Sequence, residues 1–190
     1  MRKMTAVALA LLLGLSVCAC STNQHPSTKY PPIDQLLIGL SIFPPGWEAT
    51  EPDFEHPPHA PWSGPGHLVE IVRQNFYSSF DLYTGVIVEI RRYDSGQSAT
   101  REYERRLEPI FREDSYARST LPEVVHESTI ADQARYDCSR VGCTYFARYG
   151  VYTYHCGVRI HNNDTITYTD VLPVLFQAID ERMTLALDSE

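Results

Sequence analysis

Alternating apolar and polar residues dominate the middle of the chain and predict a series of strands. Residues 68–77 and 82–93 have a period close to two, which is typical of strands with one buried face. Four later segments are rich in β-branched and aromatic residues and are also expected to be strands. They are residues 123–130, 133–138, 143–148 and 151–160.

A helical period follows the second strand. Asp94 is the expected N-cap, with Gln97 as its capping-box partner. Pro109 is expected to end or kink this helix, because proline lacks a backbone N–H. The apolar stripe comprises Ala99, Tyr103, Leu107 and Phe111, and the residues expected to face water are Arg101, Glu102, Glu104, Arg105 and Glu108.

A second helix is predicted near the end of the chain, where Thr169 or Asp170 is a suitable cap. The order of strands, helix, strands and helix favours an α+β fold, an antiparallel β-sheet with helices packed on it. The apolar stripe of this last helix comprises Leu172, Leu175 or Phe176, Ile179 and Met183.

Turns and loops are expected before the first long strand. Residues 33–40 suit a short helix or turn, and the following Pro-Pro-Gly enforces a turn that Trp47 anchors in the core. Residues 50–66 contain five prolines, so we expect an irregular loop there.

The first twenty residues resemble a targeting segment. Arg2 and Lys3 precede an apolar run over Ala6–Val17, which is shorter than the roughly 20 residues of a membrane span. Cys18 and Cys20 close the run, and an alanine stands directly before Cys20. This arrangement resembles the lipobox of bacterial lipoproteins, in which a peptidase cuts before a cysteine that carries lipid.

The resemblance implies that Cys20 is lipidated and that residues 1–19 are lost as a signal peptide. Residues 20–32 are polar and contain prolines, so they are expected to tether one domain, residues 33–190, to the membrane. The protein is then extracytoplasmic and anchored to the cell membrane or the outer membrane. The alternatives are an ordinary secretory signal and a Cys-x-Cys metal pair, for which partner ligands are missing nearby.

Composition narrows the range of partners. The formal net charge is −8, so a nucleic-acid partner has no electrostatic basis. A hydrophobic fraction of 43% is enough for a substantial core. The partners that remain are the membrane, through the lipid anchor, and an unknown protein or small molecule.

Three cysteines fall within the predicted domain, and a disulfide is expected outside the cytoplasm. We favour Cys138–Cys143, which closes a short loop between two strands. The alternative is Cys143–Cys156, which follows if Tyr149 and Gly150 form a two-residue turn. A redox-active pair lacks Cys-x-x-Cys spacing.

Two groups of residues are candidates for binding. Glu55, His56 and His59 provide carboxylate and imidazole ligands for a metal ion, although a polar, proline-rich surface loop explains the same residues. Half of the twelve tyrosines lie between residues 136 and 168. Tyr145, Tyr152 and Tyr154 are candidates for a sugar- or peptide-binding surface, and we favour the alternative that they are good strand residues with one half-buried face.

No motif names a reaction. The chain has no nucleophile elbow, His-Glu-x-x-His or Ser-x-x-Lys motif, so no catalytic residue and no cofactor are predicted. A Pro-Gly-Trp turn, two strands, a helix, further strands and a last helix ending AIDERM are similar to the PsbP-like lipoproteins of bacteria. The resemblance implies a binding or accessory protein. The alternatives are an envelope enzyme such as a hydrolase, with a site assembled in space, and a structural envelope component.

Overall fold

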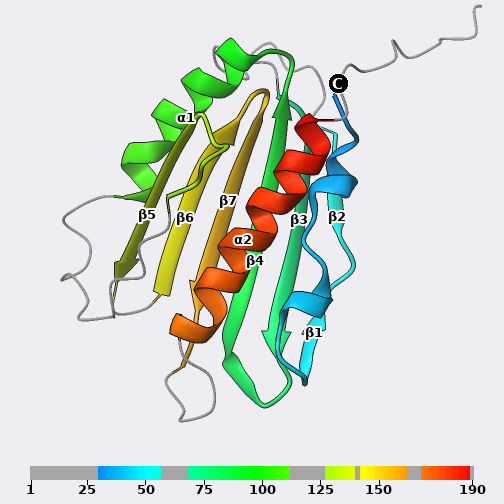
Figure 1. Ribbon diagram of the computed structural model, residues 1–190, viewed down its shortest axis with the longest axis vertical. Coiled ribbons are helices and arrows are strands. Elements are labelled where there is room, and N and C mark those ends of the chain that lie inside the picture. Colours follow the sequence, from blue (N-terminus) through cyan, green and yellow to red (C-terminus); the bar gives the residue numbers. More distant parts are fainter. Residues whose placement is uncertain (1–29, 57–67, 112–126, 140–141, 162–167, 189–190) are drawn as a thin grey trace, which may run out of the picture.

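The central element of the protein is an antiparallel β-sheet, which confirms the predicted α+β fold. The computed structural model describes residues 30–56, 68–111, 127–139, 142–161 and 168–188 (Figure 1). Within these ranges seven strands form one sheet in the order β1-β3-β4-β7-β6-β5, and β2 also pairs with β3. The strands are β1 (Trp47–Ala49), β2 (Asp53–Glu55), β3 (Leu68–Ser78), β4 (Asp81–Tyr93), β5 (Gln133–Ser139), β6 (Gly142–Tyr149) and β7 (Tyr152–Arg159).

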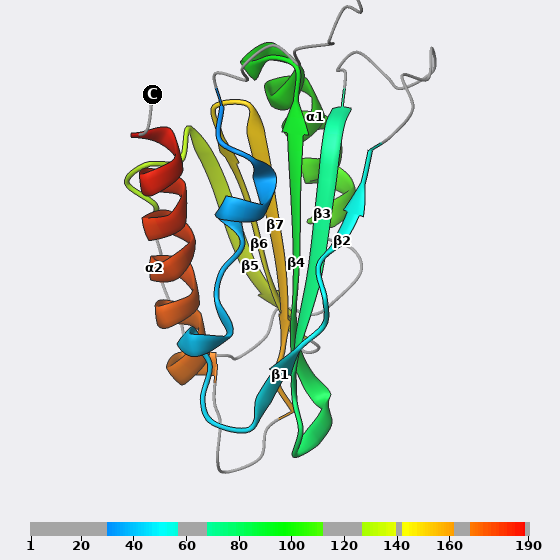
Figure 2. The ribbon, with the colours of Figure 1, turned by 90° about the vertical axis from the view of Figure 1, so that its right-hand side faces the viewer.

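Helices cover both faces of the sheet. Figure 2 shows α2 (Tyr168–Leu187) on one side of the sheet and α1 (Gly96–Ile110) on the other. Two 3-10 helices, η1 (Ile33–Leu36) and η2 (Leu40–Ile42), lie on the α2 side. None of the helices in the described ranges is both long and apolar enough to cross a membrane.

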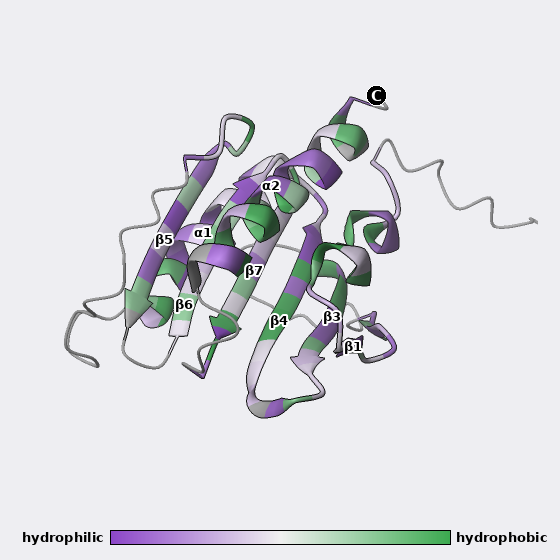
Figure 3. Ribbon diagram, turned by 60° about the horizontal axis from the view of Figure 1, so that its bottom comes forward, coloured by the Kyte–Doolittle hydropathy of each residue, from purple (hydrophilic) through white to green (hydrophobic). Residues whose placement is uncertain are grey.

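The main core lies between the sheet and α2. The predicted stripe of α2 is confirmed, because Leu172, Leu175, Phe176, Ile179 and Met183 are all at most 1% exposed. Burying a large apolar side chain contributes roughly 1.5–3 kcal/mol, so this stripe holds the helix on the sheet. Figure 3 shows that α2 and the strands each carry both hydrophobic and hydrophilic residues. This is expected of helices and strands with one face in the core and the other in solvent. The sheet contributes Val72, Phe76, Val86, Val88, Ile90, Ala147 and Val158 to this core.

The start of α1 differs from the prediction by one residue. Ser95 is the N-cap, and its hydroxyl oxygen accepts a hydrogen bond from the backbone N–H of Ser98 at 3.2 Å. The carboxylate of Asp94 instead accepts a hydrogen bond from the Ser95 hydroxyl at 3.0 Å. The helix ends at Ile110, one residue after Pro109, as expected.

The turn between β6 and β7 lies one residue later than the alternative disulfide requires. Tyr149 pairs with Tyr152, so Gly150 and Val151 form the turn, and Gly150 has the positive φ of 57° that glycine adopts most readily. This register places Cys156 opposite Tyr145 and not opposite Cys143. The alternative Cys143–Cys156 pairing is therefore wrong.

Two further predictions need correction. Residues 127–130 lie outside the strands, and residues 123–126 are outside the described ranges. The region expected to be wholly irregular contains β2, which pairs with residues 71–73 of β3. At the start of the described ranges, Tyr30 contacts the ring of Tyr152, and the Tyr152 hydroxyl donates to the Pro31 carbonyl at 2.6 Å.

Candidate binding face

Rows of register partners cross the side of the sheet on which α1 packs, which we call the α1 face. Directly paired residues of antiparallel strands point to the same side. The first row is Arg73, Glu89, His155, Phe146 and Arg135; the second is Asn75, Ile87, Gly157, Thr144 and Asp137; the third is Tyr77, Gly85 and Arg159. The ring of Tyr103 on α1 stacks on that of Phe146 with centroids 4.8 Å apart, so the helix covers the first row.

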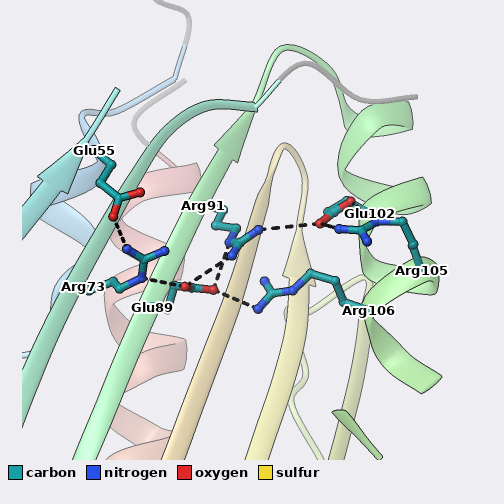
Figure 4. A network of polar contacts seen from close by, with 7 residues as sticks. All are labelled: Glu55, Arg73, Glu89, Arg91, Glu102, Arg105 and Arg106. Carbon is teal, nitrogen blue, oxygen red and sulfur yellow. Dashed lines mark hydrogen bonds and ion pairs between the residues drawn. The ribbon is translucent and has the colours of Figure 1, made fainter. Parts of the chain in front are cut away.

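Glu89 is the centre of an ion network in the first row (Figure 4). Its carboxylate accepts hydrogen bonds from Arg73 Nε at 2.8 Å, Arg91 Nε at 2.9 Å and Arg106 Nη2 at 2.9 Å. These arginines come from β3, β4 and α1. One buried carboxylate therefore ties the helix to two strands.

The network extends outward through two more carboxylates. Arg73 also pairs with Glu55 at the sheet edge. Arg91 lies 3.6 Å from Glu102 of α1, which accepts a hydrogen bond from Arg105 Nε at 2.7 Å. The side chain of Glu102 is 14% exposed, so the prediction that it faces water is wrong.

The arginines keep Glu89 ionised. Burial by itself raises the pKa of Glu89, but hydrogen bonds and charges from Arg91, Arg73 and Arg106 outweigh it and lower the pKa to about 2. A carboxylate with so low a pKa is an anion at neutral pH and cannot act there as a general acid. Its chemistry in this position is that of a fixed counter-ion.

His155 lies beside Glu89 and remains uncharged. Burial, the largest cause, and the positive charges of Arg106 and Arg91 together lower the pKa of His155 to about 4, against the opposing effect of Glu89. Its ring packs edge-on against Phe146, with centroids 5.9 Å apart. A neutral, largely buried imidazole of this kind contributes packing at neutral pH.

The far end of the α1 face, where β4 begins and β7 ends, carries a second polar cluster. Asp81 accepts hydrogen bonds from the backbone N–H of Tyr83 at 2.9 Å and from the Thr84 hydroxyl at 2.8 Å. Its carboxylate lies 3.5 Å from Nδ1 of His161. The backbone hydrogen bond from Tyr83 is the main cause that lowers the pKa of Asp81.

This cluster positions an exposed aromatic ring. Tyr83 is 63% exposed. Its ring centroid is 5.9 Å from that of His161 and 5.9 Å from the Arg159 guanidinium carbon. Nearby on the same face, Ile87 is 57% and Tyr77 36% exposed. The second and third rows therefore present apolar and aromatic surface to solvent.

In the described part of the chain, the predicted metal ligands Glu55 and His56 each have another charged partner. Glu55 forms an ion pair with Arg73. His56 is exposed, and its Nε2 atom lies 3.8 Å from Oε2 of Glu70. His59 lies outside the described ranges. Within those ranges, no three histidine, cysteine or acidic side chains converge in a way that suits a metal ion.

The candidate tyrosine surface is in the core. Tyr145, Tyr152 and Tyr154 are at most 1% exposed, so these rings do not form a binding surface. The Tyr145 and Tyr149 hydroxyls are 2.8 Å apart, and the Tyr149 hydroxyl donates to Asp180 of α2 at 2.9 Å. This buried chain of polar groups ties the sheet to α2.

The favoured disulfide is present. Cys138 and Cys143 are register partners on β5 and β6, and their sulfur atoms are bonded. Cys156 is a free, buried thiol, and burial raises its pKa. The predicted lipidation site, Cys20, lies outside the described ranges.

The network around Glu89 was not predicted, although its signals are in the sequence. Glu89 and Arg91 alternate with the apolar residues of β4 and so share its other face. Arg106 comes three residues after Tyr103, which places it on the buried side of α1. A buried charge is costly unless it is paired, so an arginine at such a position predicts a nearby carboxylate. Only the fold shows which carboxylate this is.

Comparison of the chain with family models, with curated proteins and with solved structures found no match. Function is therefore argued from the residues of this chain.

Proposed function

We propose that this protein is a lipid-anchored, extracytoplasmic binding or accessory protein of a bacterial cell envelope, attached through Cys20. The basic start, the short apolar run and the alanine before Cys20 support the anchor. The similarity to PsbP-like lipoproteins agrees with this proposal. Two or more acyl chains on one residue give stable membrane attachment.

The observation that carries the binding role is the exposed surface on the α1 face. Tyr77, Tyr83 and Ile87 are exposed together on adjacent strands. Exposed apolar and aromatic side chains that gather on one face mark interaction sites more often than isolated ones do. We infer that these residues contact the partner.

The position of the first described residues supports an orientation for the proposed anchor. Pro31 is bonded to Tyr152, which pairs with Arg92 near the end of β4. The β3–β4 turn, with Phe80, is at the other end, roughly 40 Å away along the 13 residues of β4. Figures 1 and 2 both show the turn and the first described residues at opposite ends of the molecule. The eleven residues from Cys20 to Tyr30 span at most roughly 35 Å, and the proposed anchor leads into the end of the sheet opposite Phe80.

An envelope hydrolase is the second candidate. The observation that favours it is the pair of Asp81 and His161, because a carboxylate that orients an imidazole is part of many hydrolytic sites. However, the Thr84 hydroxyl donates to Asp81 and so is not activated by the histidine. A His161→Ala variant that loses a hydrolytic activity shown by the wild type, while keeping its thermal midpoint, would establish the enzyme.

Metabolic labelling with a palmitate analogue tests the anchor. We expect label on the wild type and on Cys18→Ser, and none on Cys20→Ser. Cys18→Ser is the matched control, since it changes a thiol two residues away. Unlabelled wild type, or equal label on Cys20→Ser, contradicts the proposed attachment.

A further inference from the structure

The two long helices are attached to the sheet in different ways. The residues that α2 buries in the main core are Val171, Leu172, Leu175, Phe176, Ile179 and Met183. That core includes no residue of α1 among those the structure describes. The buried residues of α1 are Ser98, Ala99 and Tyr103, and Tyr103 forms a small separate cluster with Phe111 and Phe146. Much less apolar surface therefore opposes the release of α1 than that of α2.

The remaining attachment of α1 is polar. Arg106 donates to Glu89 of β4 at 2.9 Å, and Glu102 lies 3.6 Å from Arg91 of the same strand. Release of the helix breaks both contacts. Glu89 still accepts hydrogen bonds from Arg73 and Arg91, which belong to the sheet. Because the buried carboxylate keeps two of its three partners, the sheet tolerates the loss of the helix.

His155 lies where the aromatic and the polar attachments of α1 meet. Its register partners are Glu89 on β4 and Phe146 on β6. The ring of Phe146 stacks on Tyr103 of the helix, and the Arg106 guanidinium carbon lies 5.2 Å from its centroid. Release of α1 therefore uncovers the row that contains the imidazole.

Positive groups outnumber negative ones around His155. Its charged neighbours are Glu89 and Arg91 on β4, Glu102 and Arg106 on α1, Arg148 on β6, which pairs with Asp132, and, along the same row, Arg73 on β3 and Arg135 on β5. A proton on the buried imidazole adds one more positive charge beside Arg106 and Arg91. The pKa of about 4 reflects this cost, whereas an imidazole in water has its ordinary pKa of 6.5.

We propose that α1 is a lid that acid releases from the sheet as a unit, with His155 as the group that binds the proton. Protonation favours the released state because only there is the imidazole hydrated and distant from Arg106. Release also uncovers Phe146, two residues from Thr144 on β6, so the exposed surface of the second row extends across the first row. This gain of surface rests on the proposed binding role, whereas the release itself does not.

Hydrogen exchange of the full-length protein, followed by mass spectrometry in peptides from α1 and α2, tests the release. At pH 7 we expect the amides of α1 to be less protected than those of α2 by roughly tenfold or more, because α1 opens without the rest of the molecule. Between pH 7 and pH 5 the opening constant of α1 should rise roughly twentyfold, given a pKa of about 4 in the closed state and 6.5 in the open state. Each rate is divided by that of an unstructured peptide at the same pH.

Two pairs of variants separate the contributions. His155→Gln is expected to remove most of the pH dependence of α1. His56→Gln is its matched control, since it replaces a histidine whose side chain is 74% exposed, and should respond like the wild type. Arg106→Gln breaks the contact with Glu89 and should raise the opening constant at pH 7 roughly tenfold or more. Arg105→Gln replaces a neighbouring side chain that is 62% exposed and should change it less than about fivefold.

Three outcomes overturn the inference. The first is equal protection of α1 and α2 at both pH values, because the helix then opens only when the whole protein unfolds. The second is α1 protection that is the same at pH 7 and pH 5, and the third is a His155→Gln variant with the pH dependence of the wild type. The first two use the wild type alone and so do not require that any variant folds. Since exchange is read without a partner and without palmitate labelling, the lid can fail while the anchor and the binding role stand, and the reverse.

Discussion

Glu89 on β4 and His155 on β7 are register partners beneath α1, and at neutral pH the first is charged and the second is not. The same arginines act on both groups. They stabilise the carboxylate and oppose a second positive charge on the imidazole, so that both pKa values are lowered. One cluster of charges therefore makes stability depend on pH in two successive ranges, which meet near pH 4.

The first range belongs to His155. Its folded-state pKa of about 4 is below the ordinary 6.5, so between these values the unfolded chain binds a proton that the folded chain does not. Stability is then expected to fall by up to about 3 kcal/mol as the pH decreases from 6.5 to 4. Urea midpoints measured every half pH unit test this. His155→Gln should flatten the curve in this range; an unchanged slope in the variant assigns the effect to another group.

The second range belongs to Glu89, whose contribution is present above pH 4.5 and is lost as the pH falls toward 2. Glu89→Gln leaves Arg91 and Arg106 without their shared counter-ion, and we expect it to lower the free energy of unfolding by about 3 kcal/mol at pH 7. Glu55→Gln is the matched control. It removes a carboxylate that is 47% exposed, so its cost should stay below about 1 kcal/mol. Equal losses in the two variants would show that Glu89 is not the centre of the network.

The buried tyrosines offer a paired test of hydrogen bonding. Tyr149→Phe removes a hydroxyl that donates to Asp180 and is expected to cost about 1–3 kcal/mol. Tyr154→Phe removes a buried hydroxyl for which the described residues provide no hydrogen-bond partner, so the variant should be as stable as the wild type or more stable. Chemical denaturation of both variants decides the matter. A Tyr154→Phe loss as large as that of Tyr149→Phe contradicts this assignment.

The disulfide is expected to make a modest contribution to stability. Cys138 and Cys143 are five residues apart, and closing so short a loop is worth about 2 kcal/mol in the entropic model. The double variant Cys138→Ser/Cys143→Ser should lose this amount in urea titrations. Mass spectrometry of a non-reduced digest should find the two residues in one linked peptide pair, with Cys156 unmodified by thiol reagents until the protein unfolds. Rapid labelling of Cys156 in the folded protein would be inconsistent with its burial.

The sequence predicts local features of this fold well because they depend on period and composition. The stripe from Ala99 to Phe111 follows from the helical period alone. The alternation in β4 also identifies its two faces. The position of a turn is harder to predict, because a shift of one residue between β6 and β7 moves Cys143 from Cys156 to Val158. Gly150 indicates a turn in this region, but the sequence does not show whether it is the first or the second residue of that turn.

Candidate sites were predicted less well, because they depend on which distant residues meet. The tyrosines of β6 and β7 suit either a surface or a core, and packing of α2 on their side decides for the core. Arg73, Glu89 and Arg106 come from three elements, and no spacing in the sequence links them.

The pairing of β4 with β7 also has a consequence for how the protein folds. Its partners are between 60 residues (Arg92 and Tyr152) and 74 residues (Gly85 and Arg159) apart, whereas β3–β4, β5–β6 and β6–β7 join neighbouring segments of the chain. Local hairpins close quickly, and long-range pairing carries the larger entropic cost of loop closure. The two halves of the sheet are therefore expected to form first, and their meeting at the β4–β7 seam sets the rate at which the whole molecule reaches its native state.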